Sequence, residues 1–103
     1  MINAAEEFAG HVAEVLSKVK AVRIGYGYYE DGAPFAHLKV AYSEQELDKF
    51  MEKMNFKYDC GYGGQELYGT IWYEDGTWSS RGEYDGSEWW EHNSVPDIPE
   101  DLK

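Results

Sequence analysis

The spacing of hydrophobic and polar positions changes several times along the chain, and each change marks a predicted element. Asn3 followed by Glu6 is typical of a helix N-cap with an acidic residue three positions later. Apolar residues then recur at helical spacing: Phe8, Val12, Val15 and Val19. We therefore predict a helix over residues 3–19, with these side chains on its buried face.

The next segment alternates with a period of two, which is typical of strands. One set of alternating positions holds Val22, Ile24, Tyr26 and Tyr28. Residues 30–32, Glu-Asp-Gly, are typical of a tight turn because glycine tolerates a positive φ angle. A second strand is expected over 35–42, with Ala36, Leu38, Val40 and Tyr42 on one face. Residues 21–42 thus form a predicted hairpin.

Ser43 and Glu46 are spaced as a full capping box, so a second helix is expected over 43–54. Its predicted buried stripe consists of Leu47, Phe50, Met51 and Met54. The glycine-rich residues 55–66 are typical of a loop, with a short strand at 56–58.

A second hairpin is predicted over residues 67–84, with the turn at 74–76. Leu67, Ile71 and Tyr73 share one face of its first strand, and Tyr68 and Trp72 share the other.

Residues 85–103 follow as a tail. Pro96 and Pro99 prevent regular pairing and favour an extended course. The apolar residues of this tail indicate that it packs back along the domain: Trp89, Trp90, Val95, Ile98 and Leu102.

Together these elements predict one α+β domain over residues 1–103. The length of 103 residues leaves room for a single core. The two antiparallel hairpins would form a sheet of four strands, with both helices packed on one face.

The composition adds charge to this picture. The chain has 20 acidic and 9 basic residues, for a formal net charge of −11. Because 17% of the residues are aromatic, we expect a folded domain with an acidic surface and not a disordered acidic chain. The negative charge argues against direct binding to nucleic acid and against docking on anionic membranes.

The sequence also predicts the cellular compartment of the protein. It has no apolar run long enough for a transmembrane helix and no signal peptide at its start. Cys60 is the single cysteine, so no internal disulfide is expected, which favours a reducing, cytoplasmic setting.

A search for catalytic motifs is negative. His11, His37 and His92 lie far apart in sequence and, with Cys60, do not match a zinc spacing. Residues 61–64 are rich in glycine but lack the Lys-Ser/Thr of a phosphate-binding loop. No set of residues supplies a nucleophile, a base and an orienting group. We therefore expect no enzymatic activity, no metal and no cofactor.

The charge is concentrated in the second half of the chain. Residues 1–54 hold nine acidic and six basic residues, whereas residues 55–103 hold eleven acidic and three basic ones. Two interpretations stay open: a solvated acidic face that aids solubility, or a docking surface in which carboxylates steer a basic partner and aromatics anchor it. The candidate contact residues are Glu74, Asp75, Glu83, Asp85, Glu88, Trp89, Trp90 and Glu91.

In its size and charge, and in residues 69–78 and 82–91, the chain resembles the small, acidic, cytoplasmic proteins of phages and mobile elements. That type includes DNA mimics, inhibitors of restriction enzymes and anti-CRISPR proteins. The resemblance implies an inhibitor that acts in the host cytoplasm.

The resulting hypothesis is a non-enzymatic inhibitor of a basic, nucleic-acid-binding host defence protein, such as a CRISPR or restriction component. It would occupy a groove meant for nucleic acid. One alternative is a small-ligand module that uses the loop 61–64 and the aromatic faces of the second hairpin. Another is a phage structural or regulatory protein that self-associates through exposed tryptophans. The sequence leaves the oligomeric state open.

Overall fold

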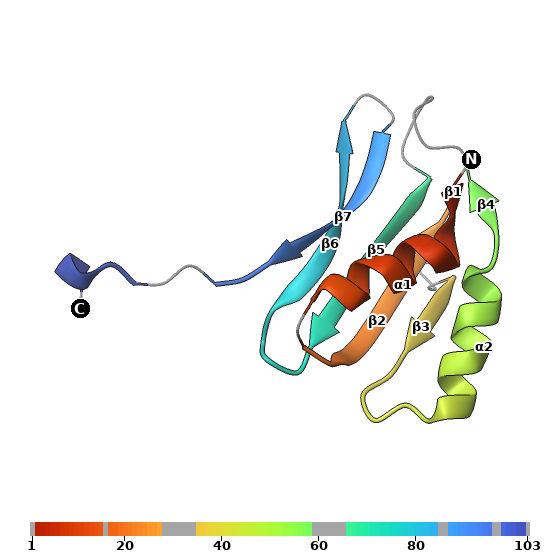
Figure 1. Ribbon diagram of the computed structural model, residues 1–103, viewed down its shortest axis with the longest axis horizontal. Coiled ribbons are helices and arrows are strands. Elements are labelled where there is room, and N and C mark those ends of the chain that lie inside the picture. The colour runs from red at the N-terminus through yellow and green to blue at the C-terminus, as the bar shows by residue number, and fades with distance from the viewer. Residues whose placement is uncertain are drawn as a thin grey trace.

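The computed structural model describes residues 2–15, 17–27, 35–58, 66–84, 87–95 and 98–102. These residues form two α-helices, a five-stranded antiparallel sheet and a separate two-stranded sheet, so the predicted α+β class is confirmed. Figure 1 shows α1 crossing in front of the sheet and α2 beside strand β3.

Helix α1 (Ala4–Glu14) begins where the sequence predicts but ends five residues early. The Asn3 side chain accepts a hydrogen bond from the Glu6 amide and caps the helix. At the other end, Val15 has extended backbone angles, and Val19 opens strand β2 (Val19–Tyr26). The prediction to residue 19 was wrong because the four-residue spacing of Val15 and Val19 fits a helix and a strand alike, whereas β-branched valine favours the strand. Pairing of Val19 with Tyr73 in the sheet decides the outcome.

Helix α2 (Glu44–Met54) agrees with the predicted second helix. Ser43 and Glu46 form the complete capping box, each side chain accepting from the other residue's amide. Phe50 and Met54 are buried as predicted.

The first hairpin joins β2 to a shorter strand than the sequence indicates. Strand β3 (Ala36–Leu38) pairs antiparallel with β2, and Ala36 and Leu38 are buried. The predicted continuation to residue 42 was wrong, since Ala41 has a φ of 64° and Val40 is 61% exposed. A left-handed residue cannot continue a strand. The predicted turn at 30–32 lies outside the described residues.

The second hairpin matches the prediction. Strands β5 (Leu67–Tyr73) and β6 (Trp78–Tyr84) pair antiparallel across a turn at residues 74–77. Gly76 has a φ of 88°, which the turn requires and which glycine adopts at little cost. Leu67, Ile71 and Tyr73 are buried, while Tyr68 and Trp72 are exposed on the opposite face.

The start of the predicted tail is a strand instead. Strand β7 (Ser87–Asn93) pairs with the whole of β6, from Tyr84 opposite Ser87 to Trp78 opposite Asn93. The sheet therefore has five strands in the order β3-β2-β5-β6-β7 and not the predicted four. Pro96 and Pro99 follow β7 and do not interrupt it.

Beyond β7, the prediction that the tail packs back along the domain was wrong for its aliphatic residues. Val95, Ile98 and Leu102 are 74%, 61% and 72% exposed. A single 3₁₀ turn (Glu100–Leu102) lies near the end of the chain, away from the sheet in Figure 1.

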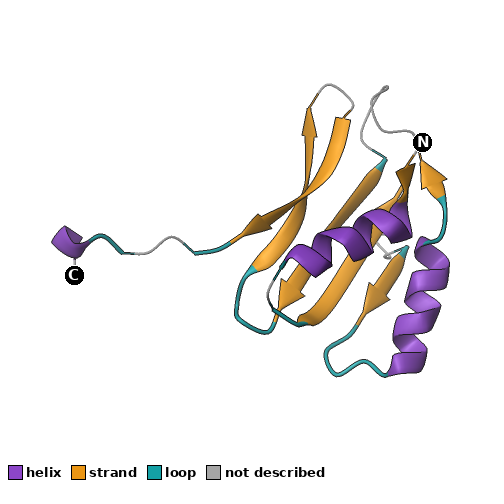
Figure 2. Cartoon of the chain, viewed as in Figure 1, coloured by secondary structure: helices purple, strands orange, loops and turns teal. Residues whose placement is uncertain are grey.

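Two short strands connect the start of the chain to the end of α2. Strand β1 (Ile2–Asn3) pairs antiparallel with β4 (Lys57–Tyr58), and the Ala4 amide donates to the Phe56 carbonyl over 2.8 Å. The short strand predicted at 56–58 is thus confirmed at 57–58. Figure 2 shows this pair at one end of both helices.

The core lies between the helices and one face of the large sheet. Phe8 of α1 contacts Phe50 of α2 edge to face, with ring centroids 5.2 Å apart, and packs against Trp90 of β7 at 6.3 Å. Inward-facing residues of the strands complete this core: Val22, Ile24, Ala36, Leu38, Leu67, Ile71 and Tyr73. The opposite face of the sheet carries no described helix or strand, and we call it the open face.

Two glycine-to-alanine substitutions test this packing as a matched pair. A Cβ at Gly69 would lie 2.8 Å from the Arg23 carbonyl oxygen and 3.1 Å from Cη2 of Trp90. We expect Gly69→Ala to lower the free energy of unfolding by about 1–3 kcal/mol. The added methyl group would clash with the Arg23 carbonyl, which belongs to the backbone of the paired strand β2 and cannot move away easily. Gly10→Ala in α1 meets no atom within 4 Å, so it should raise stability by about 0.5–1 kcal/mol. Urea denaturation measures both, and equal effects would contradict the packing.

Candidate docking surface on the open face of the sheet

Strand alternation divides the candidate contact residues of β7 into two groups. Glu88 and Trp90 point into the protein and are only 4% and 8% exposed. Trp89 and Glu91 point to the open face and are exposed. Successive side chains of a strand must point to opposite faces, so these four residues cannot form one surface. Glu88 and Trp90 are therefore not candidates for contact with a partner.

Hydrogen-bond donors from three residues surround the buried carboxylate of Glu88. Its carboxylate lies 3.2 Å from Nη2 of Arg81 on β6, and it accepts the backbone N–H groups of Glu66 and Leu67 over 2.8 and 2.9 Å. The side chains of Arg81 and Glu88 are 1% and 0% exposed. The buried pair therefore fastens β7 to β6 and to the start of β5.

Arg81 extends this network to the other end of the fold. Its Nη1 lies 3.1 Å from the Glu7 carboxylate of α1, and its Nη2 donates to the Tyr58 hydroxyl of β4 over 2.8 Å. The Tyr58 hydroxyl in turn donates to Glu7 over 2.6 Å. Burial alone would lower the pKa of Arg81, but Glu7 and Tyr58 hold it above the usual value. Burial and the hydrogen bond to Glu7 raise the pKa of Tyr58.

The Trp90 ring packs against the same cluster and supplies its apolar contacts. The Arg81 guanidinium lies 5.0 Å from its ring centroid, within the range of a cation–π contact. The His11 ring of α1 stacks on it at 6.1 Å and an interplanar angle of 25°. Sequence reasoning missed this role of Arg81. The available signal was a lone basic residue in the most acidic part of the chain.

Trp89 is fixed on the open face by its neighbours. It stands opposite Gly82 of β6, where a Cβ would lie 2.6 Å from Cε2 of the Trp89 ring. Its indole N–H donates to the Glu91 carboxylate over 2.8 Å. The absent side chain at Gly82 thus leaves the space that the indole occupies, beside a carboxylate on the same surface.

Other aromatic side chains continue this surface across the sheet. Tyr68 and Trp72 of β5 are 42% and 43% exposed, Trp89 is 37% exposed and Tyr84 at the end of β6 is 77% exposed. Large exposed aromatics on several neighbouring strands are unusual for a surface that serves only solubility. We call Tyr68, Trp72, Tyr84, Trp89 and Glu91 the docking surface.

The remaining acidic candidates lie at the margins. Glu74 and Asp75 are exposed in the β5–β6 turn, where Asp75 accepts from the Thr77 amide over 2.9 Å. The hydrogen bonds from Thr77 lower the pKa of Asp75, so this carboxylate also has a structural part in the turn. Glu83 is exposed on β6, opposite Glu88. Asp85 lies outside the described residues.

The other end of the open face is basic. A hollow of about 420 Å³ lies over β2, β3 and β5, beside the exposed Trp72. Three basic side chains line it, Arg23, His37 and Lys39, together with Ala21. Val22 and Leu38 also border it, but their side chains are buried in the core on the other face. The open face therefore changes from basic near β3 to acidic and aromatic near β7.

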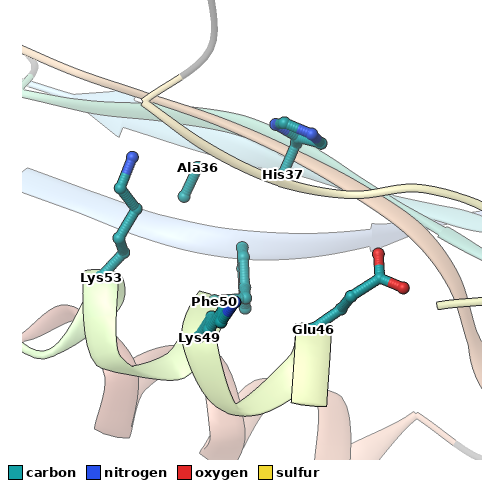
Figure 3. A pocket seen from close by; sticks show the side chains of 6 residues that line it. All are labelled: Ala36, His37, Glu46, Lys49, Phe50 and Lys53. Atoms are coloured by element: carbon teal, nitrogen blue, oxygen red, sulfur yellow. The ribbon is translucent and has the colours of Figure 1, made fainter. Parts of the chain in front are cut away.

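A second hollow between α2 and β3 is too small for most ligands. Its volume is about 190 Å³, and small-molecule sites usually measure about 300–1,000 Å³. Ala36, His37, Glu46, Lys49, Phe50 and Lys53 line it, as Figure 3 shows. The Lys53 ammonium donates to the Phe35 carbonyl over 2.9 Å, and Glu46 belongs to the capping box.

A serine and a histidine meet inside the fold but do not form a catalytic pair. Nε2 of His11 and Oγ of Ser79 are 2.7 Å apart, and the Tyr73 hydroxyl lies 2.7 Å from the same Oγ. Ser79 is 0% exposed, so no substrate reaches its hydroxyl. These contacts provide hydrogen-bond partners for the Ser79 and Tyr73 hydroxyls, as polar groups inside a protein require.

Among the described residues, no group of His, Cys, Asp and Glu side chains could hold a metal ion, and no helix is long and apolar enough to cross a membrane. Cys60 and the glycine-rich residues 61–64 lie outside the described part of the chain.

Comparison with known proteins gives no match: no protein-family model, curated protein or solved structure is significantly similar to this chain.

The partly buried position of His11 predicts how stability depends on pH. Burial lowers the pKa of His11 from 6.5, while the nearby Glu14 opposes the shift. The unfolded chain therefore binds the proton more readily, so the free energy of unfolding should fall as the pH drops below about 6.5. Urea denaturation at about pH 7.5 and about pH 5.5 measures this fall. His11→Gln should reduce it, and an undiminished fall in that variant would exclude His11 as the cause.

Proposed function

We propose that this protein is a non-enzymatic inhibitor that binds a basic, nucleic-acid-binding host defence protein through the docking surface. The observation that carries the proposal is the set of four exposed aromatic side chains on the open face, with Glu91 beside Trp89. Tryptophan and tyrosine are the usual anchors of protein interfaces. A folded chain rarely leaves so many exposed on one sheet.

Charge supports a basic partner. Residues 55–103 hold eleven acidic residues against three basic ones, and the buried pair cancels Arg81 against Glu88. The exposed acidic residues that would meet such a partner are Glu91 on the open face and Glu74 and Asp75 in the β5–β6 turn. Glu83 stands opposite Glu88 and therefore points to the other face of the sheet. Carboxylates arranged in this way increase the rate of encounter with a cationic groove.

A cationic groove for DNA or RNA offers the matching chemistry. Its arginine and lysine side chains bind phosphates along a nucleic acid, and carboxylates can replace those phosphates. Arginine also stacks on aromatic faces, which Trp89 and Trp72 would provide. The protein would then block the groove by occupying it, which needs no catalytic group. A CRISPR effector or a restriction enzyme is the proposed target class.

Competition with DNA tests this function. Purified CRISPR effectors and restriction enzymes would each be loaded with fluorescent duplex DNA, and anisotropy would follow its release. We expect release by this protein, with an affinity that falls steeply between about 50 and about 200 mM salt. Trp89→Ala should weaken binding by about thirtyfold, the effect of an interface anchor worth about 2 kcal/mol.

Two matched charge reversals distinguish a local effect on the docking surface from a general effect of net charge. Glu91→Lys changes the charge on the docking surface, and Glu52→Lys makes the same change on the exposed side of α2. Only the first should weaken binding at low salt. Equal effects of the two variants, or binding that ignores salt, would contradict a carboxylate-based docking surface.

A further inference from the structure

The two ends of the open face carry opposite charges. The pairing register places one outward-facing residue of each strand in a single row, in the order His37, Arg23, Thr70, Ser80 and Glu91. Neighbouring strands lie about 4.8 Å apart, so this row measures about 19 Å along the sheet. Its first end borders the hollow over β2, β3 and β5, which we call the basic hollow. Its other end is the exposed carboxylate of the docking surface.

The basic hollow contains two basic side chains that the fold does not use. Lys39 and His37 line the hollow and are exposed. Neither forms a hydrogen bond or an ion pair within the part of the chain that the structure describes. Arg23 lines the same hollow but already interacts within the chain. The chain has 9 Lys and Arg residues against 20 acidic ones, so basic groups left unpaired on this face favour a partner with acidic groups.

Trp72 connects the basic hollow to the rest of the docking surface. It lines the hollow and is 43% exposed, and Trp78 of β6 stands directly opposite it in the sheet. A partner that covers Trp72 therefore meets the basic hollow on one side and the β7 end of the docking surface on the other. One interface thus presents basic groups, aromatic rings and a carboxylate, in that order across the strands.

A nuclease offers the complementary order of charges. Its groove binds phosphates through arginine and lysine, and at the point of cleavage its carboxylates hold divalent metal ions. Phosphates of one DNA strand follow one another at about 3.4 Å along the helix axis. A carboxylate about 19 Å from the catalytic centre therefore replaces a phosphate about six nucleotides from the scissile bond. A groove that only binds nucleic acid has no need of such an acidic cluster.

We propose that the target is a metal-dependent nuclease bound at its catalytic centre, with Lys39 and His37 against the metal-binding carboxylates and Glu91 in the adjoining cationic groove. The Lys39 ammonium then takes the position of a divalent metal ion. Trp72 and Trp89 lie between the two ends and contact the same partner. This inference rests on the proposed function and adds which part of the target is bound. Its consequence is that the protein and the metal ion compete for the nuclease.

Competition with metal ions tests this binding mode. Calorimetry would measure the affinity of the full chain for each nuclease from which it releases DNA, in a metal chelator and in saturating Ca²⁺, with ionic strength matched by NaCl. We expect binding to be about tenfold tighter in the chelator, the effect of a close charge pair across an interface. Lys39→Gln should remove this difference, because it leaves the carboxylates without their cation. Lys49→Gln, the same change at an exposed site on α2, should preserve it.

The outcomes separate this inference from the proposed function. DNA release that requires Glu91 but ignores metal ions and Lys39 would overturn binding at the catalytic centre and leave the inhibitor function standing. Release of DNA from no nuclease would overturn both. Lys39 is exposed, so Lys39→Gln keeps the fold, which circular dichroism checks.

A second arm identifies the acidic groups that Lys39 meets. Replacing the metal-binding carboxylates of the nuclease by alanine should abolish the effect of Lys39→Gln on affinity, because the two changes remove the same charge pair. An undiminished effect would place Lys39 against an acidic patch elsewhere on the nuclease and overturn the inference.

Discussion

Arg81 and Glu88 place opposite charges inside the protein, where both side chains are almost fully withdrawn from water. Such a pair is stable only when further hydrogen bonds satisfy both groups, and here the Tyr58 hydroxyl and the Glu66 and Leu67 amides do so. The network connects α1, β4, the start of β5, β6 and β7. It therefore fixes β7, which carries Trp89 and Glu91 of the docking surface. Because Glu88 and Trp90 must face the core, Trp89 and Glu91 must face out.

Local signals predicted much of the fold. The capping box at Ser43 and Glu46 determined α2, and the alternation from Leu67 to Tyr73 determined β5 with its two faces. Strand β7 was missed because hydrophobic patterning treats Glu88 as a solvent-facing residue. Its burial depends on Arg81, seven residues earlier on the neighbouring strand, and only tertiary structure brings the two together. The end of α1 was missed because pairing of Val19 with Tyr73 is not visible in the local pattern.

The same limits apply to the candidate site. The charge of the second half of the chain directed attention to β5, β6 and β7, but the adjacent Trp89 and Trp90 gave no sign of which faced out. Gly82 and Glu91 decide this for Trp89, and Phe8 and His11 pack on Trp90. The basic hollow was not predicted, since Arg23, Lys39 and Trp72 come from three separate parts of the sequence. The open face thus combines two opposite charges that the net charge of −11 conceals.

Burial of Glu88 against Arg81 holds β7 in place. Glu91 on the same strand is exposed on the open face and contributes little to the stability of the fold. The free energy of unfolding of Glu88→Ala and Glu91→Ala, measured in urea, tests this most directly. We expect Glu88→Ala to lose about 3 kcal/mol, because it leaves the buried Arg81 charge with Glu7 as its ionic partner and removes the acceptor of the Glu66 and Leu67 amides. Glu91→Ala should stay within about 0.5 kcal/mol of the parent, as an exposed substitution does. Losses of similar size in the two variants would contradict the claim.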